Sequence, residues 1–278
     1  MRNIVFMDNY FMTKNKIEID SIGFPKNQGL YDSSKEHDSC GVGFIVDTNN
    51  HASHDIVKKG LSMLCNLEHR GAVGADPKAG DGSGILIQLP HDFFKKEINH
   101  FELPNQNEYA VGVFFIKKNE QLKDKVLKKI EQVCAAENIP FLGWRVCPTY
   151  EDELGWSVKP TTPYVYHLFV GKPDNVLEQD DFERKIYVLR QCIDKEIMQL
   201  GNEYYDQFYI PSFSSRTILY KGMVLSDQVG TVGNKLGFFD DLSDNSIVSS
   251  FALIHQRFST NTFPTWSLAQ PFRMLCHN

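Results

Sequence analysis

The stretch "KEHDSCGVGF", residues 35–44, places a cysteine between a charged, turn-prone segment and an apolar one. Residues 40–47 have the apolar run that is typical of a β-strand. A buried structural cysteine normally lies within an apolar run. Cys40 stands at the edge of such a run instead, so its position calls for an explanation.

The chain changes character on either side of this cysteine. Residues 1–39 are rich in polar and turn residues and show no sustained period, so we expect a leader rather than part of a core. Either Met1 or Met12 fits as the start of that leader. Residues 54–67 carry apolar side chains at helical spacing, so a helix is expected to follow the first strand.

The remainder of the chain predicts several strands and a few long helices. The predicted strands are 85–89, 109–116, 141–146, 164–170, 215–220 and 247–258, and the predicted helices are 122–133, 182–200 and a short one at 225–229. Asp180 or Asp181 is available to cap the second long helix. Because the strands are often consecutive, a layered arrangement with mainly antiparallel sheets fits better than strict alternation of strands and helices.

Composition excludes several classes of protein. The chain has 278 residues, 42% of them hydrophobic, and its net charge of −6 gives no basic surface for nucleic acid or an anionic membrane. It contains no run of about 18 apolar residues, and the first residues lack the apolar core of a signal peptide. Six widely spaced cysteines argue for a reducing compartment and against structural zinc. We therefore expect a cytoplasmic protein without a membrane span or a metal.

A glycine-dense stretch, residues 67–94, is typical of a loop wrapped around a site. A phosphate-binding loop is disfavoured, because the stretch lacks both G-K-[ST] and a G-x-G-x-x-G that opens a helix. His69 lies four residues after Cys65, but no second pair of metal-ligand residues accompanies them. His69 is therefore expected to be a capping or core residue.

The last unusual stretch is residues 252–278, where an apolar strand runs into Gln256 and Arg257. An arginine at the end of a strand can bind a carboxylate through two parallel hydrogen bonds. By spacing alone, a surface ion pair is an equally good interpretation of Arg257. Asn278 taken alone would most often be a loop or cap residue.

Taken together, these stretches resemble the type-2 glutamine amidotransferase domain at the start of the glutamate synthase large chain. The resemblance is carried by "DSCGVGFI", "LEHRGAVGAD", "GDGSGILIQLPHDFF", "SSRTILYKGM" and "ALIHQRFSTNTFPTWSLAQPFRMLCHN", which run in the family's order from Cys40 to Asn278. It implies an α+β fold, the four-layer αββα sandwich of N-terminal nucleophile hydrolases. It also implies that residues 1–39 are a propeptide and that residues 40–278 form the amidotransferase domain.

The resemblance also implies a reaction and its residues. Cys40 would become the first residue, with its thiol as nucleophile and its own α-amino group as base. It would attack the side-chain amide of glutamine, release ammonia, and leave a thioester that water hydrolyses to glutamate. Asn278 would stabilise the oxyanion, Arg257 would bind the substrate carboxylate, and the remaining substrate-binding matches are Phe258, Thr260 and, with a less defined role, Arg70.

In this family a glycine and later an acidic residue follow the oxyanion asparagine, whereas this sequence ends at Asn278. We therefore expect a C-terminally truncated domain with an incomplete sandwich. Its expected function is the glutaminase part of glutamate synthase, feeding ammonia to 2-oxoglutarate. FMN and an iron–sulfur cluster are implied for the synthase domain of the parent and no cofactor for this segment, while the implied partners are the other synthase domains and an electron-donating subunit or ferredoxin. The alternative is a non-catalytic remnant that binds glutamine or a partner without turnover.

Overall fold

A computed structural model describes residues 27–30, 32, 41–71, 73–206, 208–257 and 263–272. The chain divides into two compact units, residues 1–40 and residues 41–278. In the first unit, the Asn27 side chain lies 3.4 Å from the Asp32 carboxylate and donates a hydrogen bond to it. The strands and helices described below all belong to the second unit.

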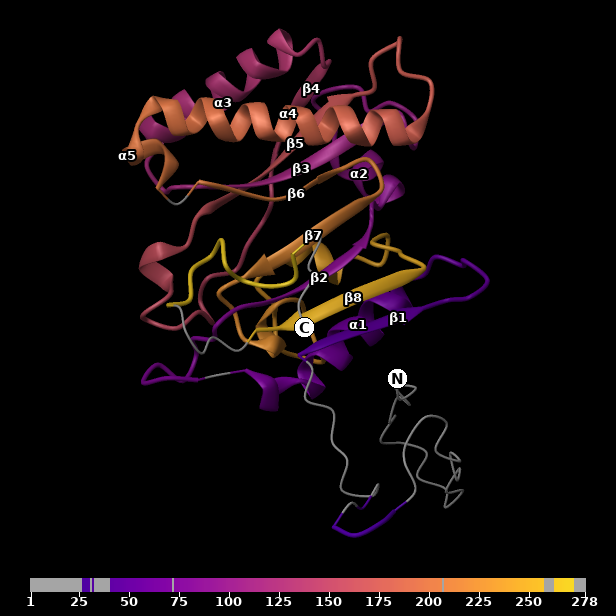
Figure 1. The fold of residues 1–278 in the computed structure, drawn as a ribbon, viewed down its shortest axis with the longest axis vertical. Helices are drawn as coiled ribbons and strands as arrows, with labels where there is room; N and C mark the ends of the chain where they lie inside the picture. The colour runs from indigo at the N-terminus through magenta and orange to yellow at the C-terminus, as the bar shows by residue number, and fades with distance from the viewer. Residues whose placement is uncertain are drawn as a thin grey trace. The chain divides into compact units, whose positions relative to one another are not determined.

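Two four-stranded sheets form the centre of the second unit (Figure 1). The first sheet has the order β1 (Val42–Val46), β8 (Phe251–Gln256), β2 (Ser83–Gln88) and β7 (Thr217–Gly222). The second has the order β4 (Phe141–Val146), β5 (Tyr164–Gly171), β3 (Tyr109–Ile116) and β6 (Tyr209–Ser214). Each pairing within these sheets is antiparallel, which confirms the sheet type expected from the sequence.

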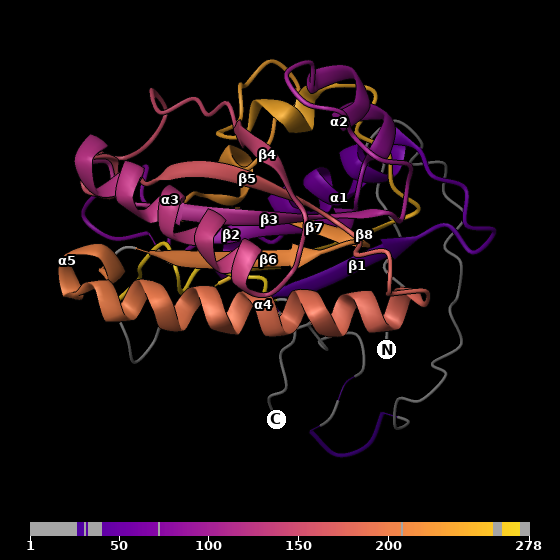
Figure 2. The same cartoon turned by 90° about the horizontal axis from the view of Figure 1, so that it is seen from above.

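Helices lie on both sides of the strands. The α-helices are α1 (His54–Asn66), α2 (His91–Glu97), α3 (Glu120–Ala136), α4 (Gln179–Leu200) and α5 (Asn202–Tyr205). Single 3-10 turns are η2 (Glu68–Arg70), η3 (Lys159–Thr161), η4 (Ser226–Gln228) and η5 (Asp240–Ser243). Figure 1 shows α3 and α4 next to the second sheet and α1 next to the first, and Figure 2, seen from above, shows α4 running along the direction of β6. Within the described residues, no helix combines the length and the apolar character that a membrane crossing requires.

Strand β3 is buried on both faces and joins the two parts of the core. Phe114 and Ile116 point toward a cluster formed with α3 and α4, and Val111 and Phe115 belong to a second cluster that includes residues of α1 and the first sheet. The apolar stripe of α4 is fully buried in the first of these clusters: Phe182, Ile186, Leu189, Ile193 and Ile197. Each such side chain contributes about 1.5–3 kcal/mol through burial.

The predicted elements are found with shifted ends. Five examples are the following: the predicted strand 247–258 is β8 (Phe251–Gln256), the strand 215–220 is β7, the strand 40–47 begins at Val42, the helix 122–133 is α3, and the helix 225–229 is the single turn η4. Strand β6 and helices α2 and α5 were not predicted.

The capping prediction for α4 was wrong. The helix begins after Glu178, whose side chain makes no capping hydrogen bond. The Asp180 carboxylate instead pairs with Arg216, and the Asp181 carboxylate pairs with Arg184. Both acidic residues still lie in the first turn, where a negative charge interacts favourably with the helix dipole.

Candidate functional site

The ends of three strands meet at one edge of the first sheet. Gln256 and Arg257 close β8, and its antiparallel neighbours β1 and β2 both begin there, with Val42 opposite His255 and Ser83 opposite Gln256. The Gln256 amide donates to the Gly41 carbonyl at 2.7 Å. The residue that follows Cys40 is therefore fixed beside the residue that precedes Arg257.

Arg257 is held by the start of β2. Its backbone amide donates to the Gly82 carbonyl at 2.9 Å, and its Nη1 donates to the Asp81 carbonyl at 3.5 Å. The side chain is half-buried, whereas Asp81 and Gly82 are buried. Arg257 is thus a cation at the end of β8 whose backbone is also hydrogen-bonded to the start of β2.

The turn η2 brings Arg70 to the same edge. The Arg70 amide donates to the Leu67 carbonyl at 2.7 Å, which continues α1 directly into this turn. A Cβ placed on Gly71 would overlap the side-chain nitrogen of Gln256, so the turn lies directly against the end of β8. Gln256 is 2% exposed, and within the described residues its Oε1 accepts no hydrogen bond.

Two of the six site residues expected from the sequence can therefore be placed. The turn that carries Arg70 and the end of β8 that carries Arg257 lie at one sheet edge, with Gly41 beside them. The other four lie outside the described residues: Cys40, Phe258, Thr260 and Asn278.

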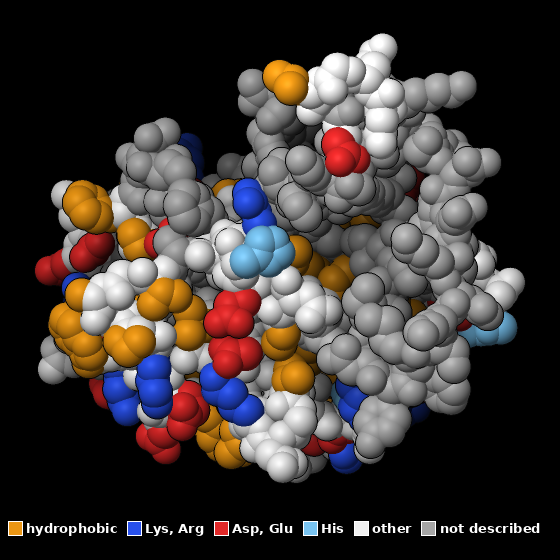
Figure 3. All heavy atoms as spheres, turned by 90° about the horizontal axis from the view of Figure 1, so that it is seen from below, with side chains coloured by type: hydrophobic (Ala, Val, Ile, Leu, Met, Phe, Trp, Pro, Cys, Tyr) orange, Lys and Arg blue, Asp and Glu red, His pale blue; other side chains and the backbone are white. Residues whose placement is uncertain are grey.

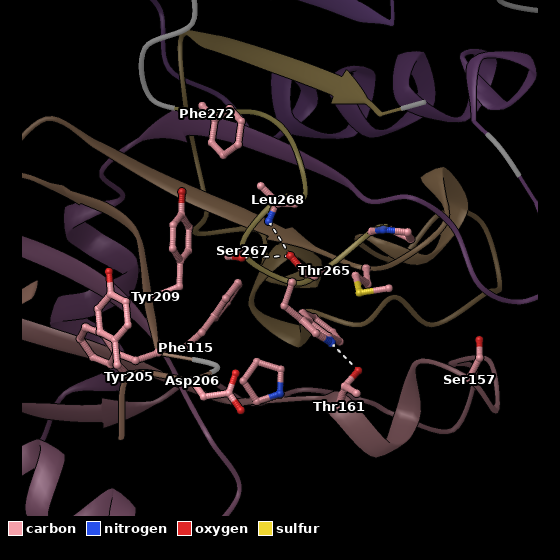
Figure 4. Close-up of a pocket in the computed structure, with 15 residues that line it drawn as sticks. Phe115, Ser157, Thr161, Tyr205, Asp206, Tyr209, Thr265, Ser267, Leu268 and Phe272 are labelled. Carbon is pink, nitrogen blue, oxygen red and sulfur yellow. Dashed lines mark hydrogen bonds between the residues drawn. The ribbon is translucent and has the colours of Figure 1, made fainter. Parts of the chain in front are cut away.

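A cavity of about 760 Å³ opens between β3, β6 and the segment that follows Arg257. Figure 4 shows aromatic side chains on its wall, among them Phe115, Tyr209 and Phe272. The segment itself supplies Trp266, whose indole Nε1 donates to Thr161 Oγ1 at 3.3 Å (Figure 4). Phe272 and Tyr209 also enclose Lys221, a functional candidate that the sequence analysis missed.

A second polar cluster is buried where β5 of the second sheet and the turn η5 come together. Donor atoms of Cys147, His167 and Asp241 lie within 4.8 Å of one another, a spacing that suits a metal ion. Arg145 already binds both carboxylate oxygens of Asp241, at 2.9 and 2.8 Å. Burial and the Arg145 cation lower the pKa of His167 to about 3, so the imidazole is neutral. A guanidinium in this position opposes a divalent cation, and we interpret the cluster as structural.

The charged side chains of the described residues are mixed in sign on the face drawn in Figure 3, where Lys and Arg lie next to Asp and Glu. Salt bridges across the surface follow the same pattern, as for Lys78 with Glu153 and Lys96 with Asp244. Such a surface lacks the extended positive field that draws nucleic acid.

Comparisons with known proteins agree with this geometry. The glutamine amidotransferase class-II family matches residues 40–278. The chain is 42% identical to the glutamate synthase [NADPH] large chain of Bacillus subtilis over 91% of its own length and 16% of that protein. It is 39% identical to the ferredoxin-dependent glutamate synthase of Pyropia yezoensis, with 91% of this chain and 16% of that protein covered.

The glutamate synthase [NADH] of Saccharomyces cerevisiae is also 39% identical, over 91% of this chain and 12% of the yeast protein. The chain thus spans less than a fifth of the length of these relatives. The family match begins at Cys40, the residue that the sequence analysis singled out, and includes the sheet edge that holds Arg257. The chain belongs to the class-II glutamine amidotransferases.

Proposed function

We propose that residues 40–278 hydrolyse the side-chain amide of L-glutamine and that this is the glutaminase part of a glutamate synthase. The observation that carries the proposal is the anchored cation at the end of β8, where Arg257 directly follows Gln256, the residue hydrogen-bonded to Gly41. A substrate with an α-carboxylate requires such a cation, and a reaction at its side chain requires a nucleophile nearby. The relatives' names support the assignment to glutamate synthase.

In the proposed mechanism, removal of residues 1–39 makes Cys40 the first residue. Its free α-amino group then accepts the thiol proton, because an α-amine with a pKa near 7.7–8.0 is a good base at neutral pH. The sulfur attacks the amide carbon, and the C–N bond breaks as the nitrogen takes up a proton and leaves as ammonia. Water then cleaves the thioester to yield glutamate and restore the thiol.

The other proposed roles follow the family resemblance. Arg257 binds the substrate carboxylate, Phe258 and Thr260 contribute to the same substrate loop, and the Asn278 amide donates to the oxyanion. Arg70 lies in a turn that packs on Gln256, which supports a place for it near the nucleophile.

The finer structural assignments are part of the proposal. The four-layer αββα arrangement is supported by the two antiparallel sheets and by helices on both sides of them. The division of the chain after residue 40 supports a leader that is distinct from the domain. A cytoplasmic location is supported by free thiols at four cysteines of the described residues: Cys65, Cys134, Cys147 and Cys192.

Cofactors and partners of the parent protein remain proposals as well. We assign FMN and the iron–sulfur cluster to the synthase domain and no cofactor to residues 40–278. The ammonia would pass to 2-oxoglutarate in the other synthase domains, with electrons from a partner subunit or ferredoxin. The relatives are named for NADPH, NADH or ferredoxin, so their names favour none of these donors for this chain.

The test is a glutaminase assay on the full chain combined with its intact mass. We expect glutamate and ammonia in equal amounts from L-glutamine and a chain that begins at Cys40. The family match disfavours a non-catalytic remnant, which would bind glutamine without releasing ammonia. A mature chain that binds glutamine but forms no ammonia would sink the proposal.

Arg257→Lys should raise the glutamine KM about tenfold or more and change kcat much less. Lysine keeps the charge but loses the paired, planar donors that match a carboxylate. Loss of uniform substrate binding appears in KM. Steady-state kinetics with glutamine measure the effect, and Arg216→Lys, at an exposed ion pair with Asp180, is the matched control. An unchanged KM would remove Arg257 from carboxylate binding.

A further inference from the structure

Lys221 is a buried lysine that forms no ion pair with a carboxylate in the described part of the chain. It lies on β7 and is 1% exposed. Its Nζ donates to the Ser267 carbonyl at 3.0 Å and to the Ala269 carbonyl at 2.7 Å. The same nitrogen lies 4.6 Å from the centre of the Tyr209 ring and 4.5 Å from that of Phe272. One side chain of the sheet thus holds the segment after Arg257 at three points.

The sheet surface beneath that segment is shaped to receive it. A Cβ on Gly222, the residue after Lys221, would lie 2.5 Å from the Trp266 ring. A Cβ on Gly82 would lie 2.6 Å from the Ala269 Cβ, and the φ of Gly82 is +116°. Glycine is needed at both positions, because any side chain would displace the segment. Residues 266–270 are therefore seated directly on β2 and β7.

This contact surface of β2 and β7 under residues 266–270, here called the seat, connects Lys221 to Arg257. Gly82, which contacts Ala269, is also the residue whose carbonyl accepts the hydrogen bond from the Arg257 amide. Lys221 binds the carbonyl of that same Ala269. A displacement of the segment would therefore move Gly82, and with it the carbonyl that holds the Arg257 amide.

We propose that Lys221 is a positioning residue for the glutaminase reaction, holding residues 266–272 on β2 and β7 and thereby fixing Arg257 for the substrate carboxylate. This inference rests on the proposed function. It gives Lys221 no contact with the substrate. The expected defect without it is weaker glutamine binding rather than slower chemistry at the thiol.

Burial and the charges around Lys221 give the seat a pH dependence. Tyr209 of β6 and Phe272 face the amine, and the cations that act on it are Arg190 of α4 and Arg257. Burial first, then these two cations, lower the pKa of Lys221 from 10.5 to about 7. Release of the segment would return the amine to water and to its higher pKa. Protonation therefore favours release, and the seated state gains stability as the pH rises above about 7.

The experiment compares Lys221→Met with the wild-type full chain. The glutamine KM should rise about tenfold while kcat changes less than about threefold. Lys59→Met, on the exposed face of α1 in an ion pair with Asp55, is the matched control and should leave both constants unchanged. An unchanged KM in Lys221→Met, or an equal loss in the control, would overturn the inference.

Trp266 provides a second readout that needs no activity. It is 7% exposed on the seated segment. In a chain whose Trp144 and Trp156 are replaced by phenylalanine, its emission should shift to shorter wavelength as the pH rises from about 7 to about 10. Lys221→Met should show red-shifted emission with no such titration.

If the variant fails to fold, the titration of the Trp266 chain with Lys221 intact decides, because a flat profile contradicts the inference. If the Trp266 chain with Lys221 intact shows the emission change but the wild-type chain has no glutaminase activity, the proposed function fails and the positioning role of Lys221 on the segment stands.

Discussion

Cys40→Ala should reduce glutamine hydrolysis by about 10⁴-fold or more, because loss of a nucleophile removes the covalent route altogether. The leader should also remain attached in this variant, since the proposed maturation exposes the same residue. In the full-length parent, synthesis from added ammonia should continue at the wild-type rate, because it does not require glutamine hydrolysis. The measurements are ammonia release, intact mass and ammonia-dependent glutamate formation.

Cys65→Ala is the matched control for this variant. The Cys65 thiol is half-buried, and burial together with Asp227 and Glu68 raises its pKa to about 11, so it carries almost no thiolate at neutral pH. Its replacement should leave the glutaminase rate unchanged. If Cys40→Ala kept glutamine hydrolysis near the wild-type rate, Cys40 would have no part in the mechanism.

Asp241→Ala should lower the free energy of unfolding by about 3–5 kcal/mol, because it removes the buried partner of the Arg145 guanidinium and leaves only Glu97, at 3.5 Å. The carboxylate accepts both Arg145 hydrogen bonds and a third from the Tyr220 hydroxyl at 3.1 Å. Its side chain is 1% exposed, so water cannot replace these bonds without opening the core. Urea unfolding followed by circular dichroism measures the loss.

Asp244→Ala tests whether the effect comes from burial. Asp244 pairs with Lys96 at 2.7 Å near the surface, and this replacement should cost less than about 1 kcal/mol. Replacing Arg145 and Asp241 together by leucine and methionine should recover part of the stability, because no charge is then left unpaired. Equal losses for Asp241→Ala and Asp244→Ala would show that the buried pair contributes no more than a surface one.

The long periodic elements were predictable from the sequence, because their burial is one-sided or continuous. The apolar stripe of α4 and the uninterrupted run of β3 match the core they form. Strand β6 was missed because Pro211 interrupts it, and a proline argues against a central strand. In the structure β6 is an edge strand of its sheet, where a missing amide donor is tolerated.

The candidate site was predictable only in part. Arg257 and Arg70 were found through the strings around them, yet their shared sheet edge depends on the register of β1, β8 and β2, which local patterns do not encode. Lys221 had a visible signal, a lysine inside the buried run "TILYKG". The role of this lysine could not be predicted, because it depends on the segment that covers it. The contacts of Lys221 to Ser267 and Ala269 join residues 46 and 48 positions apart.

The order of strands in the first sheet determines when that sheet can form during synthesis on the ribosome. Strand β1 lies at the edge of that sheet and pairs with β8, and the adjoining Asn50 and Ser250, 200 residues apart, share a hydrogen bond. At about 5–20 residues per second, a ribosome needs roughly 10–40 s to add that length of chain. Throughout that interval β1 waits without its partner strand, and Arg257 has not been made. The first turnover of a new chain must therefore come after β8 emerges, and Phe44, 60% exposed even in the folded domain, stays in contact with solvent throughout.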